Sequence, residues 1–483
     1  MGAEKFPAEF DACRALVQDR LRVECSFDLV TRCVQMEGRQ AQIYFIDGMV
    51  KDETLNKILD LLFQMEREKL AALPSARAFA DRVVSYGETD LVDDLETFLT
   101  FVLSGSVGML VEGFPEAILI DARTYPARAV MEPENDRVLR GAREGFVETL
   151  VNNTAMIRRR IRDPRLTMEL LQVGERSKTD VVLCYLEDQA DRKLLQRLRK
   201  NLRAIRVPAL AMGMESLVES MTPRQWWNPF PRARYTERPD AAAACVAEGQ
   251  VILLMDNYPA GMILPTGIFD FLQDANDFCF SPVTGTYLRW LRLLVSVLTT
   301  VLTPIWYLCV KNPGIIPPVM NFIKIHENIE MPLLLQFLLI ELVIGALKLA
   351  SLNTPPALSS SFSVVGALVL GEFAIKAELM IPETVLFMAF VTMANFAQPS
   401  YELGYALTFG RTLLLVAAAL WNVWGAVGAG ALILLAISLT RTLSGNCYWY
   451  PLIPLRPKAL ASIFLRTSIG EGKKKPKSGK QKK

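Results

Sequence analysis

The chain has 483 residues, a net charge of +2 and a hydrophobic fraction of 51%. Its length exceeds that of one ordinary domain core, so at least two structural units are expected. Because 53 basic residues are nearly balanced by 51 acidic ones, the composition predicts no nucleic-acid partner. Charge is dense in residues 1–285 and sparse in residues 288–440, which predicts a polar N-terminal half and an apolar C-terminal half.

Cysteine and histidine usage narrows the possible chemistry. The eight cysteines form no CxxC or Cys/His zinc spacing, so free thiols in a reducing compartment are expected. His326 is the single histidine in the sequence, which removes most catalytic triads and histidine metal sites. We therefore expect a protein that is not an enzyme and has no catalytic residues, no metal and no cofactor.

The polar half contains two patterns that recur in the same order. Residues 42–47 predict a strand that leads into a helix near 52–70, and residues 182–187 predict a strand that leads into a helix near 191–204. Each pair has a predicted β-hairpin in its half of the region, at 108–120 and 253–264. The repeat, after about 140 residues, predicts two cytosolic α/β subdomains of similar plan, in residues 1–140 and 141–285.

Each of the two predicted strands ends in an acidic residue, Asp47 and Glu187. A catalytic or metal-binding carboxylate is one interpretation of this position. Strand ends and helix caps favour acids for structural reasons, so the structural interpretation is preferred. No glycine-rich phosphate loop follows either strand.

The apolar half contains five runs that suit a bilayer. They cover residues 291–310, 331–350, 362–380, 381–397 and 412–439. The last is too long for one perpendicular helix, so we expect it to tilt or to break at Gly425, Gly428 and Gly430. We assign residues 286–445 to a multi-span helical membrane domain and residues 446–483 to a basic cytoplasmic tail.

Flanking positive charges predict that both termini lie in the cytoplasm. Arg289 and Arg292 precede the first run, and the C-terminal tail is rich in lysine. Both ends on one side require an even number of crossings, although five runs are visible. We expect residues 331–350 to be the irregular run because Glu341 and Lys348 interrupt it. The alternative is that residues 412–439 form a hairpin.

The third apolar run contains polar residues at helical spacing. Ser361, Val365, Leu368, Glu372 and Lys376 share one helix face, which predicts either a pore lining or a buried bundle interior. A structural ion pair between Glu372 and Lys376, four residues apart, is the alternative. Small residues elsewhere on the same helix would let neighbouring helices approach, namely Gly366 and Gly371.

A basic cluster lies in the second predicted subdomain. It contains Arg158, Arg159, Arg160 and Arg162. These side chains are expected to dock acidic partner surfaces or lipid head groups. A solvated helix face is the alternative, as for most charge runs.

Several sequence segments together resemble the A subunit of the GerA family of bacterial spore germination proteins. The first is RGAREGFVE at 140–148, and the others lie at 157–162, 174–181, 236–240, 364–371 and 399–403. The resemblance covers roughly residues 40–455. Three further segments are similar to the stage V sporulation protein AF branch of that family, at 226–235, 285–290 and 450–454.

The resemblance implies properties that the residues alone do not give. It implies an integral protein of the spore inner membrane, with other germination proteins of that membrane as partners. It also implies a homo-oligomeric ring around a cation-conducting pore, in contact with membrane lipids. In the family, sensing is assigned mainly to a separate B subunit, and the AF branch is linked with the release of dipicolinic acid.

These observations favour an oligomeric ion-channel or gating subunit that promotes ion release across the spore inner membrane during germination. The fold class expected is an α/β cytosolic region of two similar subdomains followed by an α-helical polytopic membrane domain. The main alternative is a non-conducting membrane scaffold or assembly subunit for a germination or dipicolinic acid release complex. An enzyme with a membrane anchor would need converging catalytic groups, and a carrier would usually show inverted repeats in its spans; neither is visible.

Overall fold

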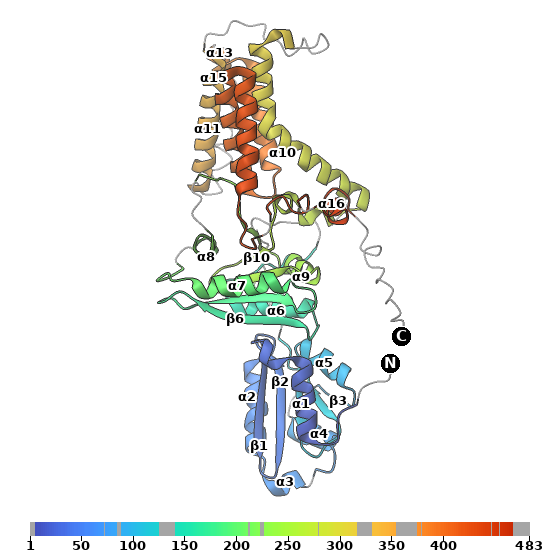
Figure 1. Ribbon diagram of the computed structural model, residues 1–483. Helices are drawn as coiled ribbons and strands as arrows, with labels where there is room; N and C mark the ends of the chain where they lie inside the picture. Colours follow the sequence, from blue (N-terminus) through green and yellow to red (C-terminus); the bar gives the residue numbers. More distant parts are fainter. Residues whose placement is uncertain are drawn as a thin grey trace. The chain divides into compact units, whose positions relative to one another are not determined.

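The computed structural model describes residues 5–466, apart from residues 72, 85–87, 125–140, 211–212, 223–226, 279, 316–330, 354–373, 378, 446 and 454 (Figure 1). The chain forms two compact units. The sheet unit comprises Met1–Pro223, Ala233–Thr266 and Leu443–Gly445. The helical unit comprises Arg224–Arg232, Gly267–Thr442 and Asn446–Lys483. Each unit therefore includes a short segment from the other half of the sequence.

The sheet unit contains two five-stranded antiparallel sheets with the same strand order. The first runs β1-β2-β4-β5-β3 and the second β6-β7-β9-β10-β8, so each strand has a counterpart in the other sheet. The repeat expected from the sequence is therefore a real duplication of the fold. The strands of the first sheet are β1 (Leu29–Met36), β2 (Arg39–Ile46), β3 (Thr89–Val92), β4 (Val107–Val111) and β5 (Ala117–Ile120). Those of the second are β6 (Leu166–Val173), β7 (Thr179–Leu186), β8 (Arg234–Thr236), β9 (Val251–Met255) and β10 (Gly261–Leu264).

Both sheets are covered on their two faces. Strands β4 and β9 are buried along their whole length, which explains why their sequences VGMLV and VILLM are almost continuously apolar. In the first sheet, helices α2 (Asp52–Phe63) and α4 (Ala76–Val83) contribute to one core, and α1 (Phe10–Leu21) and α5 (Leu95–Leu103) to the other. In the second sheet the corresponding helices are α7 (Arg192–Ala204) and α8 (Met214–Met221), with α6 (Leu150–Arg160) and α9 (Pro239–Ala247) in the opposite core.

The helices follow from apolar spacing and capping. In α2, Leu55, Ile58, Leu59 and Leu62 recur every three or four residues and are buried. Helix α7 repeats this pattern with Leu194, Leu195, Leu198 and Leu202. The side chain of Asp191 caps α7 by accepting a hydrogen bond of 2.8 Å from the amide of Lys193.

The described part of the helical unit contains four longer helices. They are α10 (Pro282–Lys311), α11 (Leu333–Asn353), α14 (Pro382–Phe396) and α15 (Tyr401–Leu439). Three described helices are long and apolar enough to cross a membrane, at Pro282–Lys311, Leu333–Ala350 and Tyr401–Leu439. Shorter elements in the chain are α3 (Arg67–Ala71), α13 (Ala374–Lys376), α16 (Pro457–Phe464) and the 3-10 helices η1 (Val23–Cys25), η2 (Ile268–Leu272), η3 (Ala275–Phe278) and η4 (Pro313–Ile315).

Helix α15 is a hairpin of two helices. Its helical geometry is interrupted at Trp421 and Asn422, and Asn422 adopts a φ of 56°. A Cβ added to Gly425 would lie 2.0 Å from the carbonyl oxygen of Ala417, so the two arms run back against each other at close range. The turn therefore lies at Asn422 instead of at the glycines, and Gly425 allows the close approach.

The hairpin turn is held by the end of α10. The amides of Asn312 and Asn422 exchange two hydrogen bonds of 2.7 and 2.8 Å. The ammonium of Lys311 donates to the carbonyl oxygen of Ala419 at 2.7 Å, at the end of the first arm. Helix α11 is continuous through Glu341 and Lys348, so residues 331–350 are not the irregular run that we expected. The hairpin alternative describes residues 412–439 correctly.

The chain enters and leaves the helical unit at the same end of its bundle. Just after α15, Thr440 accepts a hydrogen bond of 2.8 Å from Asn228, which precedes the first helix. The hydroxyl of Tyr448 donates to the carbonyl oxygen of Pro231 at 2.7 Å. In α16 the ring of Phe464 lies 5.2 Å from that of Trp290, near the start of α10. The segments that precede α10 and follow α15 therefore lie together at one end of the bundle.

Candidate functional site in the helical unit

Most of the predicted pore face lies outside the described residues. Those positions are Ser361, Val365, Leu368 and Glu372, together with the packing glycines Gly366 and Gly371. Lys376 is described; it ends the short helix α13, and its side chain is exposed. The pore face and its alternative, an ion pair between Glu372 and Lys376, both stay predictions.

Arg411 is the centre of a polar cluster that the described helices form. Its side chain is only 3% exposed and forms an ion pair with Glu341 of α11. Its Nη1 also donates to the carbonyl oxygen of Thr299 in α10 at 3.3 Å. A charge inside a bilayer is unfavourable unless it is paired or hydrated. Arg411 therefore connects α10, α11 and α15 through interactions that offset its burial.

A row of hydroxyl groups lies along the buried face of α10. Ser296, Thr299 and Thr303 are three or four residues apart, so they share one helix face, and all are buried. The hydroxyl of Ser296 donates to the side-chain oxygen of Gln398 at 2.9 Å. This face is polar over about two turns inside a largely apolar bundle.

Several buried donors near this row have no acceptor among the described residues. They are Nε of Arg411, Nε2 of Gln398 and Nε1 of Trp306. The hydroxyls of Thr303 and Thr384, both 0% exposed, also lack a partner in this part of the chain. Buried polar groups are nearly always satisfied by protein or by water. The cluster is therefore suited to hold water molecules or another hydrogen-bond acceptor.

Lys348 adds a second positive charge to the same face of α11. It follows Glu341 by two helical turns, so the two side chains point the same way. With the amide of Asn395 oriented to place its oxygen toward Lys348, the oxygen lies 3.1 Å from Nζ. The ammonium also lies 5.2 Å from the ring centre of Phe396. Lys348 thus contacts an amide oxygen and an aromatic ring, whereas Glu341 pairs with Arg411.

The sequence had indicated only part of this cluster. Glu341 and Lys348 stood out as charges within an apolar run. Arg411 was missed because it directly precedes the run that begins at Thr412 and looked like a flanking charge. The signal that could have found it is the apolar stretch on both sides of it, from Leu403 to Leu439.

The arginine cluster of the sheet unit does not form one exposed surface. Arg158 is 0% exposed and pairs with Asp28, so it cannot dock a partner or a lipid. Arg160 pairs with the half-buried Glu144 at 2.5 Å, and Arg159 lies 3.5 Å from the same carboxylate. Arg162 is exposed. A docking role stays a prediction for Arg159, Arg160 and Arg162.

The acidic residues at the strand ends also have structural surroundings. Glu187 lies 3.5 Å from the guanidinium of Arg22. Burial raises the pKa of Asp47, whose backbone amide donates to the carbonyl oxygen of Asp28 at 2.8 Å. Across the described residues, no group of three or more His, Cys, Asp or Glu side chains is placed to hold a metal ion.

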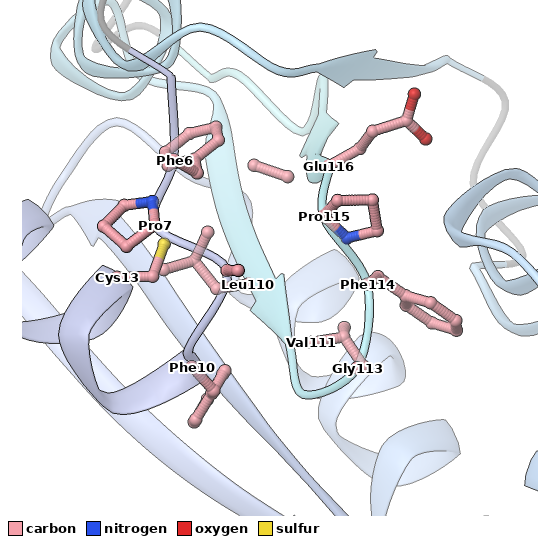
Figure 2. Close-up of a pocket in the computed structure, with 12 residues that line it drawn as sticks. Phe6, Pro7, Phe10, Cys13, Leu110, Val111, Gly113, Phe114, Pro115 and Glu116 are labelled. Atoms are coloured by element: carbon pink, nitrogen blue, oxygen red, sulfur yellow. The ribbon is translucent and has the colours of Figure 1, made fainter.

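Figure 2 shows a small pocket in the first subdomain, between the N-terminal segment and the β4–β5 hairpin. Its walls include Phe6, Pro7, Cys13 and Phe114. Its free volume of about 20 Å³ is enough for one water molecule and too small for an organic ligand. Burial raises the pKa of the Cys13 thiol to about 11, which makes this cysteine a poor nucleophile at neutral pH.

Comparison with known proteins places the chain in a family. The model of the Bacillus/Clostridium GerA spore germination protein family matches residues 16–478. The chain belongs to the GerA family. It is 36% identical to Stage V sporulation protein AF of Bacillus subtilis (strain 168) over 459 residues, which cover 95% of this chain and 92% of the relative. It is also 27% identical to spore germination protein GerLA of Bacillus cereus, over 91% of this chain and 89% of the relative.

Two further proteins are similar to this chain. Spore germination protein KA of Bacillus subtilis (strain 168) is 24% identical over 96% of this chain and 86% of its own length. Among solved structures, the N-terminal domain of the A subunit of the Bacillus megaterium spore germinant receptor GerK3 covers 55% of this chain and 97% of the solved chain, with 24% identity and a TM-score of 0.42. The chain is therefore a membrane protein of a spore germination family, as the sequence motifs predicted.

Proposed function

We propose that this chain is a homo-oligomeric ion-channel or gating subunit that promotes ion release across the spore inner membrane during germination. The observation that carries the proposal is the buried polar cluster around Arg411. Polar and charged residues inside a membrane bundle are rare, and they commonly mark ion or proton pathways. The membership of the GerA family supports the germination part of the proposal.

The chemistry of the cluster favours hydration over a purely structural role. An ion pair that only joined two helices would not need the row of hydroxyls at Ser296, Thr299 and Thr303. Donors of Arg411, Gln398 and Trp306 are also buried and have no acceptor among the described residues. Because each such donor is unfavourable in a dry interior, water inside the bundle accounts for all of them together.

We propose oligomerisation because a single copy leaves much apolar surface exposed and is too small to enclose a pore. The helical unit exposes large apolar side chains along its described helices, including Leu294, Ile305, Leu342, Phe409 and Trp424. Such surfaces are expected to contact lipid or neighbouring subunits. We propose that copies form a ring in which the face of Ser361, Val365, Leu368, Glu372 and Lys376 lines the axis. The polar cluster would then lie within each subunit and support the conformation of the axis-lining segment.

The scaffold alternative keeps one specific observation in its favour. The ion pair between Arg411 and Glu341 ties α15 to α11, and such a pair also suits a rigid assembly subunit that conducts nothing. In that case the protein would organise other spore inner-membrane germination proteins. The two functions differ in one measurable property, which is ion flux by the purified protein alone.

Ion release from loaded liposomes tests the proposal. The purified chain is reconstituted into liposomes that contain potassium ions, and release is followed after dilution into a potassium-free buffer. We expect potassium release that increases with the amount of protein per liposome and does not occur from protein-free liposomes. Mass photometry of the same sample should give multiples of 54.0 kDa. Correctly inserted oligomers that release no ions would contradict the channel and support the scaffold.

A further inference from the structure

Helix α7 presents an exposed face that is almost entirely basic. Arg192, Lys193, Arg197, Lys200 and Arg203 are exposed, and only Gln196 among the exposed long side chains of this helix is neutral. No acidic residue occurs within Arg192–Ala204. A shallow surface groove follows part of this face, with Lys200 and Arg203 among its walls. We call the five exposed cations the basic face of α7.

The fold itself does not require these charges. Helix α2 follows the matching strand in the first subdomain and also buries an apolar face, made of leucine and isoleucine where α7 uses leucine alone. Its exposed charged residues are Asp52, Glu53, Lys57 and Asp60, three acids and one base. The duplication thus supplies an internal comparison: two equivalent helices carry exposed charges of opposite sign. The basic face of α7 is a property added to the shared fold.

The charges on this face are unfavourable for the helix alone. Lys193 and Arg197 are four residues apart, and Lys200 lies three residues from both Arg197 and Arg203. Like charges at these spacings repel each other and destabilise a helix. Arg192 and Lys193 also lie in the first turn, where the helix dipole favours acids. An external anionic surface would offset both the repulsion between these cations and their unfavourable interaction with the helix dipole.

Internal partners account for little of the basic face. Arg199, which is half-buried, pairs with Glu169 at 2.8 Å and belongs to the structure of the subdomain. For Arg192, Lys193, Lys200 and Arg203, the described residues provide no ion pair. Four exposed cations therefore remain available to a partner outside the subdomain.

The remaining cation of the face contacts a segment that follows a membrane helix. Arg197 donates a hydrogen bond to the carbonyl oxygen of Ser444. Leu443 is buried in the same core as Leu194 and Leu198 of α7. Both residues come within five positions of the end of α15, which ends at Leu439 and is long and apolar enough to cross a membrane. The chain itself thus joins this face, through a few residues, to the end of a membrane helix.

We propose that the basic face of α7 binds the anionic phospholipid head groups of the bilayer that holds the helical unit. Clusters of basic residues close to the end of a membrane helix are attracted to anionic lipid surfaces, and each contributes about five-fold to the affinity. The attraction acts on the head-group phosphates and is weakened by salt. The binding fixes the second subdomain against the membrane surface, whether or not the protein conducts ions.

Hydrogen exchange of the full-length protein in lipid nanodiscs tests this inference. The nanodiscs contain either phosphatidylcholine alone or an equimolar mixture of phosphatidylcholine and phosphatidylglycerol. We expect the amides of α7 to exchange several-fold more slowly in the mixed bilayer at low salt, and the difference to disappear in concentrated sodium chloride. Equal exchange in both bilayers at low salt would overturn the inference.

A matched pair of variants makes the test specific. The binding variant carries glutamine in place of Arg192, Lys193, Lys200 and Arg203. The control variant carries glutamine at four exposed basic positions of the first subdomain, namely Lys51, Lys57, Arg77 and Arg82. The control should retain the lipid effect on α7, and the binding variant should lose it. If the exchange protection of α7 is the same in both bilayers but depends on whether the subunits are assembled, the lipid inference is overturned and the face contacts a neighbouring subunit.

A charge-conserving variant protects the test from a folding failure. Arg192→Lys with Arg203→Lys keeps the charge of the face and changes only the shape of two side chains. Because head-group attraction depends on charge, this variant should keep the lipid effect. Loss of the effect in this variant, with the same unfolding temperature as the parent, would contradict electrostatic binding to lipid.

Discussion

The guanidinium Nε of Arg158 lies 2.8 Å from the carboxylate Oδ2 of Asp28, a residue 130 positions earlier in the chain. Both side chains are fully buried, at 0% and 1% exposure. The Nη2 of Arg158 also donates to the hydroxyl of Ser26 and to the carbonyl oxygen of Leu166, each at 3.0 Å. Asp28 precedes the first sheet and Arg158 lies in the last turn of α6 of the second subdomain, so this pair fixes the two duplicated subdomains to each other.

Asp28→Ala should strongly destabilise the sheet unit. The substitution leaves the guanidinium of Arg158 buried without its anion, and breaking a buried pair in this way is unfavourable by about 3–5 kcal/mol. The measurement is the free energy of unfolding by denaturant, followed by circular dichroism. The control is Glu144→Ala, which removes the half-buried partner of Arg160 and should change stability by about 0–1 kcal/mol. Equal effects of the two substitutions would contradict the assigned role of Asp28.

The buried thiols should resist modification in the folded protein. Burial raises the pKa of Cys13 from 9.0 to about 11 and that of Cys184 well above the ordinary range. We expect Cys25, Cys33 and Cys447, which are exposed, to react with iodoacetamide at pH 8 before Cys13 or Cys184. Peptide mass spectrometry gives the order. Early labelling of Cys184 without unfolding would contradict its burial.

The raised pKa of Cys13 also affects the stability of the protein at high pH. The folded protein holds the Cys13 proton more tightly than the unfolded chain, so the stability from this thiol is complete below pH 9. It is lost progressively as the pH rises from 9 to about 11. Cys13→Ser should therefore flatten this part of the unfolding profile, although other groups also titrate there. An unchanged slope would contradict the raised pKa.

Two glycines of the α15 hairpin should respond differently to the same substitution. A Cβ at Gly425 would lie 2.0 Å from the carbonyl oxygen of Ala417, whereas a Cβ at Gly428 would have nothing within 4 Å. Gly425→Ala should destabilise the helical unit by about 1–3 kcal/mol because the two arms must separate. Gly428→Ala should be neutral or slightly stabilising. Thermal unfolding followed by size-exclusion chromatography compares them, and equal loss in both variants would rule out the hairpin packing.

The sequence predicted the architecture better than the polar site. The apolar spacing and the order of the motifs predicted the duplicated subdomains, because residues such as Leu55 and Leu195 recur at matching places in α2 and α7. The partners of Arg158 and Arg411 could not be predicted, because each lies far away in sequence and pairing depends on how helices pack. Charge runs were also misleading: Arg158 looked like surface and is buried, whereas the exposed basic face belongs to α7. The alternation of apolar and basic residues in α7 contained that information.

Thr303→Val should distinguish a hydrated interior from a dry one. Thr303 is 0% exposed and its hydroxyl lacks a partner among the described residues. In a dry bundle, replacing it by a methyl group should stabilise the protein by about 1–3 kcal/mol. In a hydrated ion path we expect slower ion release without that gain. Thr300→Val is the control, since its hydroxyl bonds the carbonyl oxygen of Ser296 at 3.3 Å. A gain in stability with unchanged ion release would contradict hydration of this row.

The reversal potential of the purified protein in a planar bilayer, under a gradient of potassium chloride, tests the channel proposal most directly. In the proposed pore, a ring of Glu372 carboxylates would concentrate cations at the axis, so we expect the reversal potential to shift from zero toward the equilibrium potential of potassium. Glu372→Gln should move this potential toward zero while the oligomer stays intact. Absence of any conductance from correctly assembled protein, or a reversal potential shifted toward the equilibrium potential of chloride, would contradict the channel proposal.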